Sequence, residues 1–375
     1  MKKKIAIIGS GIGGLTAANL LIKNSDFEII VYEKEKMLSL EEGYGIQLAP
    51  NSISILNKIG FRNIDKNHIF NPLKLNFYSN NNKICDLDLG KFNNDSIKYT
   101  TLQRSTLIEF LKDKLFTNNF RFGKEVRKVS KIQDKLLINF SDNTNDLVDF
   151  IIVSDGVFSK TKSIIESKDI KPRYNGSVAI RSVIKFSEEF NYESKNISLI
   201  MLPNAHIVIY PINKKGYFNL VCIVREKLSQ NYDINSIIKK KILSKNKNLE
   251  NLFKADLNLW PVYVSKKPIK SIHDNVFYLG DAFYTFVPAL AQGASQSIEA
   301  AYELFNLLYE NKKNIQNLYF TKRLKRTKQI NKRSKFNYFG FHTSNPLLMN
   351  LRNFILKHLV INKNFIQSYL GKIYK

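Results

Sequence analysis

The sequence predicts an α/β fold, in which a three-layer Rossmann-like domain is interwoven with an antiparallel sheet domain and followed by C-terminal helices. The chain opens with a short apolar strand, a glycine-rich turn and an apolar-periodic helix, which together begin a βαβ unit. Residues 172–264 are mostly strand-like, whereas residues 298–375 are mostly helical and basic. A further buried strand follows the strand-rich segment, at Val276 to Leu279, so the two domains are interwoven and not arranged in series.

The N-terminal part of the chain supplies most of the Rossmann-like elements. Residues 4–8 predict a buried strand, residues 12–22 a helix, and residues 27–33 the second strand of the unit. Beyond them we expect a helix from Pro50 to about Gly60, a hairpin over 73–89, a helix over 105–116 and a strand over 150–153.

The strand-rich middle predicts the second domain. Its segments alternate or are apolar throughout over residues 177–184, 198–201, 206–210 and 217–224. We therefore expect a discontinuous Rossmann-like domain, a sheet domain and a helical region. Their predicted ranges are 1–70, 101–165 and 270–310 for the first, 71–100 and 166–269 for the second, and 311–375 for the third.

The charge balance leaves several classes of partner open. The chain has 58 Lys and Arg against 32 Asp and Glu, a formal net charge of +26. Such a balance suits nucleic acid, an anionic membrane surface or acidic ligands, but the basic residues are spread along the whole chain. No nucleic-acid-binding module is visible, so we expect no nucleic-acid partner and favour a basic, soluble surface.

The two cysteines indicate neither a disulfide framework nor a zinc site. Cys85 and Cys222 lie far apart in apolar segments and form no CxxC, so both are expected to be buried thiols. The five histidines are scattered, without metal-ligand spacing, and each is expected to be structural. No stretch has the length of a signal peptide or a membrane span, so a cytoplasmic protein without a metal is expected.

The glycine-rich turn predicts a dinucleotide site. Gly9 permits the tight turn after the strand, Gly11 lets the backbone approach a pyrophosphate, and Gly14 allows the helix to pack closely on the strand. The helix then presents free N–H groups to the phosphates, and Glu33 at the end of the next strand can accept bonds from ribose hydroxyls. The loop residues predicted to bind the cofactor are Gly9, Gly11, Ile12, Gly13 and Gly14.

Four further segments decide which dinucleotide is expected. SDGVFSKTK at 154–162 resembles the GADGxxSxxR motif of the FAD-dependent monooxygenases of the aromatic-ring hydroxylase type, and GDAFYTFVPALAQG at 280–293 resembles their GDAAHxxxPxxGQG segment. GIQLAPN at 45–51 resembles their GIxLxPNA loop, and Arg104 resembles the arginine before their third helix. The motifs occur in the family's order over most of the chain, as in members similar to salicylate hydroxylase and ubiquinone-pathway hydroxylases.

The resemblance implies that FAD is bound by residues far apart in the sequence. Asp281 would accept a bond from the ribityl chain, and the helix that begins near Gly293 would point its N–H groups at the flavin pyrimidine edge. Taken alone, Asp281 is better explained as an ordinary helix cap or turn aspartate, and Val126 is equally a core valine. The further residues that the resemblance assigns to the cofactor are Gln47, Arg104, Val126, Asp155, Gly156 and Ala294.

Three residues depart from the family's pattern. Tyr284 stands where a histidine is usual, Ala291 replaces a glycine close to the flavin ring, and Lys162 replaces an arginine. Lysine cannot form the bidentate fork of an arginine, although it still donates hydrogen bonds. These changes leave FAD binding expected and put the efficiency of hydroxylation in question.

The implied reaction consumes NADH or NADPH and O2. The resemblance implies that NAD(P)H reduces FAD and that a flavin C4a-hydroperoxide transfers one oxygen atom to a small aromatic or isoprenoid-like substrate. Pro288, Tyr284 and Arg181 are the candidate catalytic residues, with the substrate between the sheet and the flavin. Alternative functions are an FAD-dependent reductase or dehydrogenase without oxygen insertion, and a non-catalytic flavoprotein that binds a membrane or a partner.

A basic cluster near the C-terminus gives a separate hypothesis. It precedes an apolar, amphipathic segment, Leu347 to Leu359, which we expect to pack on the FAD domain. Alternatively, the cluster and this segment together form a peripheral membrane contact. The basic residues are Lys322, Arg323, Lys325, Arg326, Lys328, Lys332, Arg333 and Lys335.

Overall fold

The computed structural model describes residues 2–38, 44–80 and 82–374. A five-stranded parallel sheet forms the centre of its Rossmann-like domain. Its strands are buried on both faces, so their sequences are nearly continuous apolar runs and not alternating ones. In spatial order the strands are β18 (Val276–Tyr278), β12 (Phe150–Val153), β1 (Lys3–Ile8), β2 (Phe27–Tyr32) and β8 (Phe120–Arg121).

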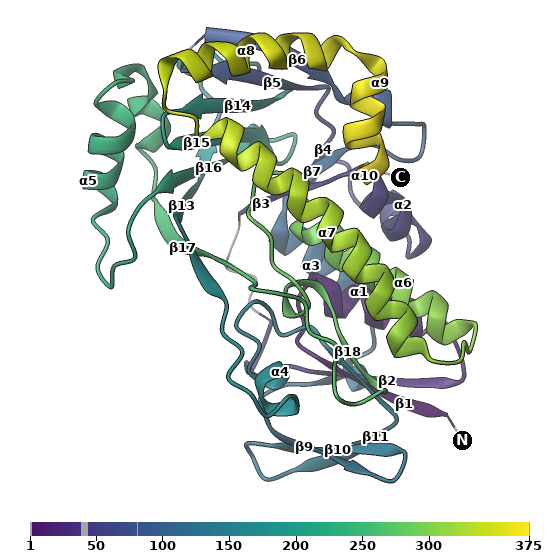
Figure 1. Cartoon of the computed structure of the whole chain (residues 1–375). Coiled ribbons are helices and arrows are strands. Elements are labelled where there is room, and N and C mark those ends of the chain that lie inside the picture. The colour runs from purple at the N-terminus through teal and green to yellow at the C-terminus, as the bar shows by residue number, and fades with distance from the viewer. Residues whose placement is uncertain (1, 39–43, 81, 375) are drawn as a thin grey trace.

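Two different layers cover this sheet, which makes the domain three-layered (Figure 1). Helices α1 (Ile12–Leu21), α3 (Arg104–Lys112) and α6 (Gly293–Tyr309) form one cover and share a large core with the sheet. A three-stranded antiparallel meander forms the other, through Val126, Leu136 and Phe140. The strands of the meander are β9 (Val126–Ile132), β10 (Lys135–Phe140) and β11 (Asn145–Val148), and α4 (Lys160–Ile165) packs beside β9.

A seven-stranded sheet forms the second part of the molecule. All its neighbouring strands are antiparallel except β5 and β14, which run parallel. One face is closed by an apolar core under α5 (Ile234–Ile238) and the turns that follow it. In spatial order the strands are β17 (Asn258–Val264), β13 (Arg173–Lys185), β16 (Tyr217–Arg225), β15 (Ala205–Pro211), β14 (Ile197–Leu202), β5 (Lys74–Ser79) and β6 (Asn82–Asp88).

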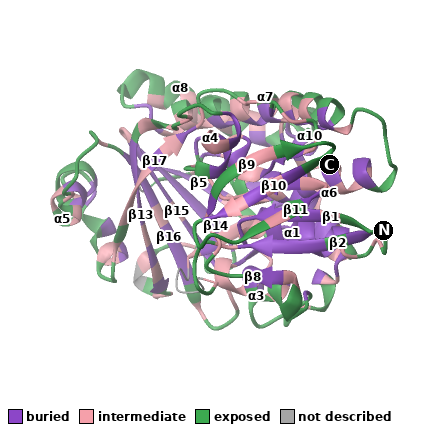
Figure 2. Cartoon of the chain, turned by 90° about the horizontal axis from the view of Figure 1, so that it is seen from below, coloured by how far each residue is buried: buried purple, intermediate pink, exposed green. Residues whose placement is uncertain are grey.

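A small antiparallel sheet is formed by strands that come just before and just after β5 and β6 in the sequence. Its strands are β3 (Gly45–Leu48), β7 (Thr100–Gln103) and β4 (Ile69–Phe70), and α2 (Pro50–Lys58) follows β3 directly. The buried residues lie mainly in the strands of the large sheets, whereas exposed ones lie in loops and outer helices (Figure 2). The predicted fold class is confirmed, while the division of the chain into domains at the predicted boundaries stays a prediction.

The C-terminal helices cross both sheets. Helix α7 (Ile315–Phe341) runs diagonally over the molecule, and α8 (Pro346–Ile361) lies across the top, followed by α9 (Lys363–Ile366) and α10 (Lys372–Tyr374) (Figure 1). The expectation that residues 347–359 pack on the FAD domain is wrong, because α8 lies against β6 of the seven-stranded sheet. The Arg352 guanidinium anchors the helix there by donating to Ser79 Oγ at 2.9 Å. Within the described residues, no helix combines the length and the apolar character needed to cross a bilayer.

Candidate active site

The glycine loop lies at the carboxyl end of β1 and is tightly packed on one side. Gly9 has a φ of +99°, and a Cβ atom on Gly14 would lie 2.2 Å from the Gly9 carbonyl oxygen and 2.5 Å from Ser154 Oγ. In contrast, no atom lies within 4 Å of the Cβ position of Gly11, so the loop faces open space there. The first turn of α1 contains no acidic residue and no side-chain cap, which leaves its N–H groups available to an anion.

Glu33 lies beside this loop. One of its carboxylate oxygens accepts hydrogen bonds from the Ser10 N–H at 2.9 Å and from Ser10 Oγ at 2.5 Å. The other oxygen accepts from the Glu35 N–H at 3.2 Å. The second strand of the βαβ unit therefore places the predicted ribose acceptor next to the predicted phosphate cradle, at the edge where parallel strands end.

The segment after β12 contributes a partly buried acid. Asp155 Oδ2 accepts from the Thr161 N–H at 3.2 Å, while Oδ1 is buried and has no hydrogen-bond partner among the described residues. Burial raises the pKa of Asp155, and hydrogen bonds from Ser159 and Thr161 oppose the rise. Gly156 follows with a φ of +87° and no atom within 4 Å of its Cβ position.

Lys162 connects this segment to the next one. Its ammonium group is buried and donates to the Ala282 carbonyl at 2.7 Å. Burial lowers the pKa of Lys162, while the charges of Asp155, Asp281 and Glu166 raise it. Lys162 therefore holds the two segments together with one directed hydrogen bond.

Asp281 comes directly after β18 and borders the cavity described below. Its side chain is accessible, yet the surrounding protein atoms remove enough water to raise the pKa of its carboxyl to about 6, against a hydrogen bond from Thr285 and the charge of Lys162. Helix α6 begins nearby at Gly293, whose Cβ position also has no atom within 4 Å. Beside it, Gln292 Nε2 is buried without a hydrogen-bond partner among the described residues.

The remaining predicted cofactor residues lie on separate elements. Arg104 is the first residue of α3, and its N–H donates to the Tyr44 carbonyl at 2.8 Å. Gln47 lies on β3, lines the cavity and accepts a bond from the Tyr99 hydroxyl at 2.8 Å. The side chain of Val126 is buried in the core, so only its backbone could meet a ligand.

These residues fit an extended dinucleotide such as FAD. A phosphate needs the open N–H groups in front of α1, a ribose needs Glu33, and a flavin needs space and donors in front of α6. The unpartnered Asp155 Oδ1 and Gln292 Nε2 are buried polar atoms of the kind that a ligand normally satisfies. The assignment of each residue to FAD stays a prediction.

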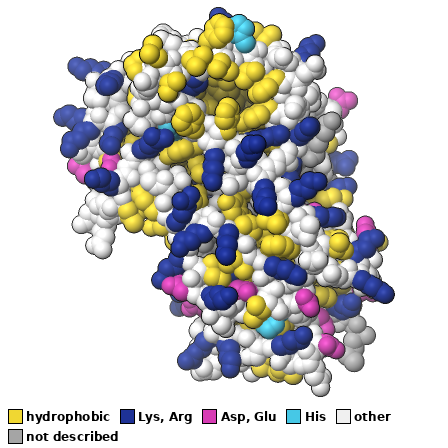
Figure 3. Space-filling view, viewed as in Figure 1, with side chains coloured by type: hydrophobic (Ala, Val, Ile, Leu, Met, Phe, Trp, Pro, Cys, Tyr) yellow, Lys and Arg dark blue, Asp and Glu magenta, His cyan; other side chains and the backbone are white. Residues whose placement is uncertain are grey.

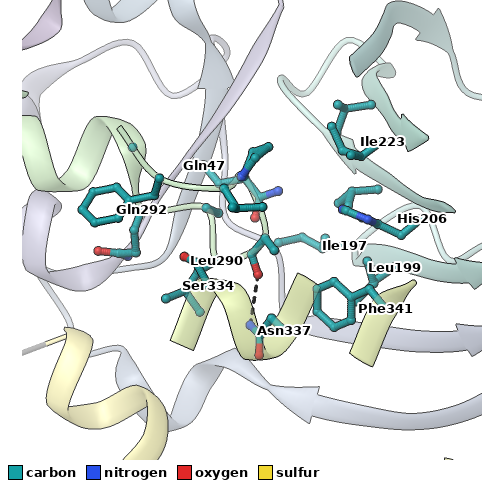
Figure 4. A pocket seen from close by; sticks show the side chains of 18 of the residues that line it. Gln47, Ile197, Leu199, His206, Ile223, Leu290, Gln292, Ser334, Asn337 and Phe341 are labelled. Carbon is teal, nitrogen blue, oxygen red and sulfur yellow. Dashed lines mark hydrogen bonds between the residues drawn. The ribbon is translucent and has the colours of Figure 1, made fainter. Parts of the chain in front are cut away.

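A cavity of about 530 Å³ lies between residues 281–294, which include Asp281 and the start of α6, and the seven-stranded sheet. Its floor is the sheet face that the apolar core does not use, so alternate residues of neighbouring strands point into it. The floor residues are Leu75, Phe77, Ala179, Arg181, Ile197, Leu199, His206, Val208, Tyr210, Asn219, Val221 and Ile223. Residues 285–294 and helix α7 form two adjacent walls, joined where Asn337 donates to the Ala289 carbonyl at 3.0 Å (Figure 4).

Arg181 is the charged group on the cavity floor. It makes no hydrogen bond or ion pair with any described residue, and its Nε is buried without a partner. Its guanidinium lies 5.9 Å from the ring centroid of Trp260, which also lines the cavity. A partly desolvated guanidinium beside an aromatic ring and without a carboxylate can bind an acidic ligand.

Two cavity residues were missed in the sequence. His206 was expected to be structural, yet it lines the cavity together with Tyr210 on the same strand (Figure 4). Its Nδ1 lies 2.7 Å from Nε2 of His342, and burial lowers the pKa of His206 to about 3, so the ring is neutral near pH 7. Residues 206 and 210 are an even number of positions apart on a predicted strand, so the sequence alone indicates that both point to one face of the sheet.

The candidate catalytic residues are only partly brought together. Pro288 and Arg181 both line the cavity. Tyr284 does not line it and instead packs against Phe286, with ring centroids 5.2 Å apart, next to the core of the β9–β11 meander. The structure therefore supplies no contact between Tyr284 and a substrate in this cavity.

Ala291 occupies a backbone conformation that favours glycine, with a φ of +50°. We expect Ala291→Gly to raise the free energy of unfolding by about 0.5–1 kcal/mol, because relief of the left-handed strain exceeds the added entropy of the unfolded chain. Thermal and urea unfolding of the flavin-free protein measure this. Ala289→Gly, at a neighbouring position without a positive φ, should lower the free energy of unfolding. If both variants lose stability equally, Ala291 is not strained.

Comparisons with known proteins agree with this geometry. A family model described as an NAD(P)-binding Rossmann-like domain matches residues 7–41, the glycine loop and the second strand. The 3-amino-4-hydroxybenzoate 2-monooxygenase PtnB3 of Streptomyces platensis is 25% identical over 370 residues, covering 94% of this chain and 92% of the relative. Salicylate hydroxylase of Pseudomonas putida is 21% identical over 344 residues, covering 84% of this chain and 79% of the relative.

Solved structures share the fold over the whole chain. HpxO of Klebsiella pneumoniae, crystallised with FAD and uric acid, superposes with a TM-score of 0.88 at 18% identity, covering 99% of this chain and 96% of the other. A salicylate hydroxylase substrate complex superposes with a TM-score of 0.81 at 17% identity, covering 100% and 95%. The resemblance to FAD-dependent aromatic-ring monooxygenases that the motifs predict is confirmed.

Proposed function

We propose that this chain is an FAD-dependent monooxygenase that uses NADH or NADPH and O2 to hydroxylate a small aromatic substrate bearing an acidic group. The single observation that carries the substrate class is Arg181, a cavity guanidinium without a hydrogen-bond or ion-pair partner among the described residues. The relatives named as monooxygenases support the reaction class. The cavity volume and its aromatic lining suit one ring with short substituents.

The cofactor would be held by the segments that converge at the carboxyl end of the parallel sheet. The N-terminus of α1 would bind the pyrophosphate, Glu33 the adenosine ribose and Asp281 the ribityl chain. When bound, FAD supplies hydride acceptance from NAD(P)H and the activation of O2, chemistry that side chains alone cannot perform. The N-terminus of α6 at Gly293 would offer its positive dipole end to the negative charge of reduced FAD.

The residues of this chain orient the substrate and exclude water. Arg181 would bind the acidic group, and the apolar floor residues Val208, Val221 and Leu199 would pack against the ring. His206 is neutral and has one ring nitrogen turned to His342, so its other nitrogen is available to a substrate hydroxyl. In the tautomer in which His206 Nδ1–H donates to His342 Nε2, the free His206 Nε2 would accept a bond from the hydroxyl and make its oxygen more electron-donating to the ring.

Oxidation of NAD(P)H with a panel of ring compounds tests the function. Protein reconstituted with FAD should oxidise NADH or NADPH faster with hydroxylated benzoates than with the same rings lacking a carboxylate. Mass spectrometry should find one added oxygen atom per NAD(P)H oxidised. Stimulated oxidation with no oxygenated product would instead support the reductase alternative, and a protein that binds no FAD would refute the proposal.

FAD affinity is expected to depend on pH through Asp281. The raised pKa of about 6 means that the carboxyl is protonated below this value and loses its charge-assisted bond to the cofactor. The dissociation constant of FAD should therefore increase as pH falls below about 6, with a limiting slope of about tenfold per unit. Flavin fluorescence titrations between pH 5 and 8 measure the effect.

The matched variant is Asp281→Asn, which keeps the shape but does not titrate. It should bind FAD more weakly at neutral pH, with a flat profile over the same range. A wild-type profile that is equally flat would exclude Asp281 from the cofactor site.

A further inference from the structure

Helix α8 is apolar on two sides: Leu356 and Val360 pack inward, and a second apolar row faces solvent. Amphipathic helices normally bury their apolar stripe, but the inward face of α8 includes Arg352 and Asn353, and Arg352 donates to Ser79 Oγ and the Gly340 carbonyl. The outward face repeats at helical spacing and is 43–79% exposed. We call it the α8 ridge, and it consists of Leu347, Leu348, Leu351, Phe354, Ile355 and Ile361.

The ridge continues onto the end of α7 and into the cavity. Phe336 and Phe339 of α7 are both 63% exposed. Between α7, α8 and α9 the surface is hollowed and lined by hydrophobic side chains (Figure 3). Residues of all three helices, including Phe336, Leu356 and Phe365, also line the substrate cavity. The exposed apolar surface therefore surrounds an opening of the cavity, which an ordinary solvent-facing helix would not do.

The same part of the chain contains no acidic residue. From residue 311 to residue 375 there are eleven lysines and four arginines, with no aspartate or glutamate. The arginines of the predicted basic cluster are used inside the protein. Arg323 and Arg326 pair with Glu303 and Glu299 of α6, and Arg333 donates to the Ser368 carbonyl at 3.0 Å.

The lysines of that cluster behave differently. Lys325, Lys328, Lys332 and Lys335 are exposed at spacings of three and four, so they form one outward stripe along α7. None of these four forms an ion pair within the part of the chain that the structure describes. The row of basic side chains below the apolar hollow is visible on the same face (Figure 3).

We propose that this face, formed by the α8 ridge and the lysine stripe of α7, docks on the surface of an anionic lipid bilayer. Apolar side chains would enter the acyl boundary while lysines meet the headgroups, which is the arrangement of interfacial amphipathic helices. A second copy of this chain fits less well, because a symmetric contact would bring the two lysine stripes together in a protein of net charge +26. Nucleic acid would meet the lysines but leave the apolar ridge without a partner.

Vesicle sedimentation of the flavin-loaded full chain tests the docking. The protein should bind phosphatidylcholine vesicles that contain phosphatidylglycerol, and bind pure phosphatidylcholine far less. Binding should weaken steeply with salt, because the Debye length shrinks from about 10 Å at 0.1 M to about 3 Å at 1 M. Equal binding to both kinds of vesicle, or binding to neither, would overturn the proposal.

Two sets of variants separate the contributions. Gln at Lys325, Lys328, Lys332 and Lys335 should reduce binding by about 100-fold or more, since each surface lysine contributes about fivefold on an anionic leaflet and the factors multiply. The control removes equal charge elsewhere, with Gln at the exposed Lys128, Lys131, Lys239 and Lys240, and should bind like the wild type. Equal loss in both would show that only net charge matters and would overturn the docking face.

The double variant Leu351→Ser with Phe354→Ser tests the ridge. Both side chains point outward, so the variant should keep its flavin content and its melting temperature. We expect about tenfold weaker vesicle binding. The control pair, Phe116→Ser with Ile132→Ser, alters exposed apolar residues outside the face. Phe354→Trp should give a blue-shifted emission on anionic vesicles that brominated lipids quench, above the background of the single native Trp260.

The second-copy alternative has its own signature. If light scattering shows a dimer in solution that Leu351→Ser with Phe354→Ser converts to a monomer, and vesicles bind neither form, the face is an interface between copies and the proposal is refuted. An unshifted emission from the Phe354→Trp variant on bound vesicles would likewise refute insertion of the ridge.

Discussion

Gly14→Ala is expected to disrupt the nucleotide-binding loop and to yield protein without FAD. The new Cβ atom would lie 2.2 Å from the Gly9 carbonyl oxygen and 2.5 Å from Ser154 Oγ, and backbone and buried side chain leave little room to relax. We expect a loss of about 3 kcal/mol in the free energy of unfolding, typical of severe overpacking. Flavin absorbance of the purified protein and urea unfolding of the flavin-free form measure the two effects.

Gly11→Ala is the matched control in the same loop. Gly11 has a φ of −73°, which alanine adopts without strain, and no atom lies within 4 Å of its Cβ position. The variant should therefore fold with nearly unchanged stability, yet bind FAD about tenfold or more weaker, because the methyl group enters the space in front of the helix N-terminus. If both variants lose stability equally, the close packing assigned to Gly14 is wrong. If Gly11→Ala binds FAD normally, the pyrophosphate lies elsewhere.

Arg181→Met is expected to lower kcat/KM for an aromatic acid by about 100-fold or more. The side chain keeps much of its apolar length against Trp260, but the substrate carboxylate loses charge-assisted hydrogen bonds worth about 1.5–3 kcal/mol in a partly desolvated cavity. Steady-state NAD(P)H oxidation with product analysis measures the loss. FAD content should stay unchanged.

Arg181→Lys distinguishes charge from geometry. Lysine keeps the positive charge and loses the planar fork, so activity should recover only in part. The discriminating substrate is the same ring with a neutral amide in place of the carboxylate, on which wild type and Arg181→Met should perform alike. Equal losses on the acid and on the amide would mean that Arg181 acts on the cofactor and not on the substrate.

Local patterns predicted the nucleotide-binding half of the molecule well. The apolar runs of β1, β2, β12 and β18 each match a buried parallel strand, because a strand covered on both faces needs apolar residues throughout. The glycine loop could also be predicted from the sequence, because a φ of +99° at Gly9 and the tight contact at Gly14 each require glycine. Such requirements act within a few residues, so a single sequence displays them.

The lining of the cavity could not be predicted from the sequence, because it depends on which face of the sheet other elements cover. His206 and Tyr210 share a face by their spacing alone, but only the packing of α5 on the opposite face leaves theirs open to the cavity. Similarly, Arg181 is one strand arginine among several in the sequence. Its lack of a carboxylate partner is a property of the assembled surroundings.

By itself, then, the sequence determined the order of the elements, the glycine-rich cradle and the acids that follow the parallel strands, since these rest on backbone sterics and local burial. Only the tertiary structure decided the lining of the cavity and the orientation of α8. Leu356 and Val360 of α8 pack inward as an apolar stripe should, yet Arg352 also lies on the inward side, bonded to Ser79 and Gly340, while Leu351 and Phe354 face solvent. Those partners lie 273 and 12 residues away in the chain, and periodicity within one helix contains no information about them.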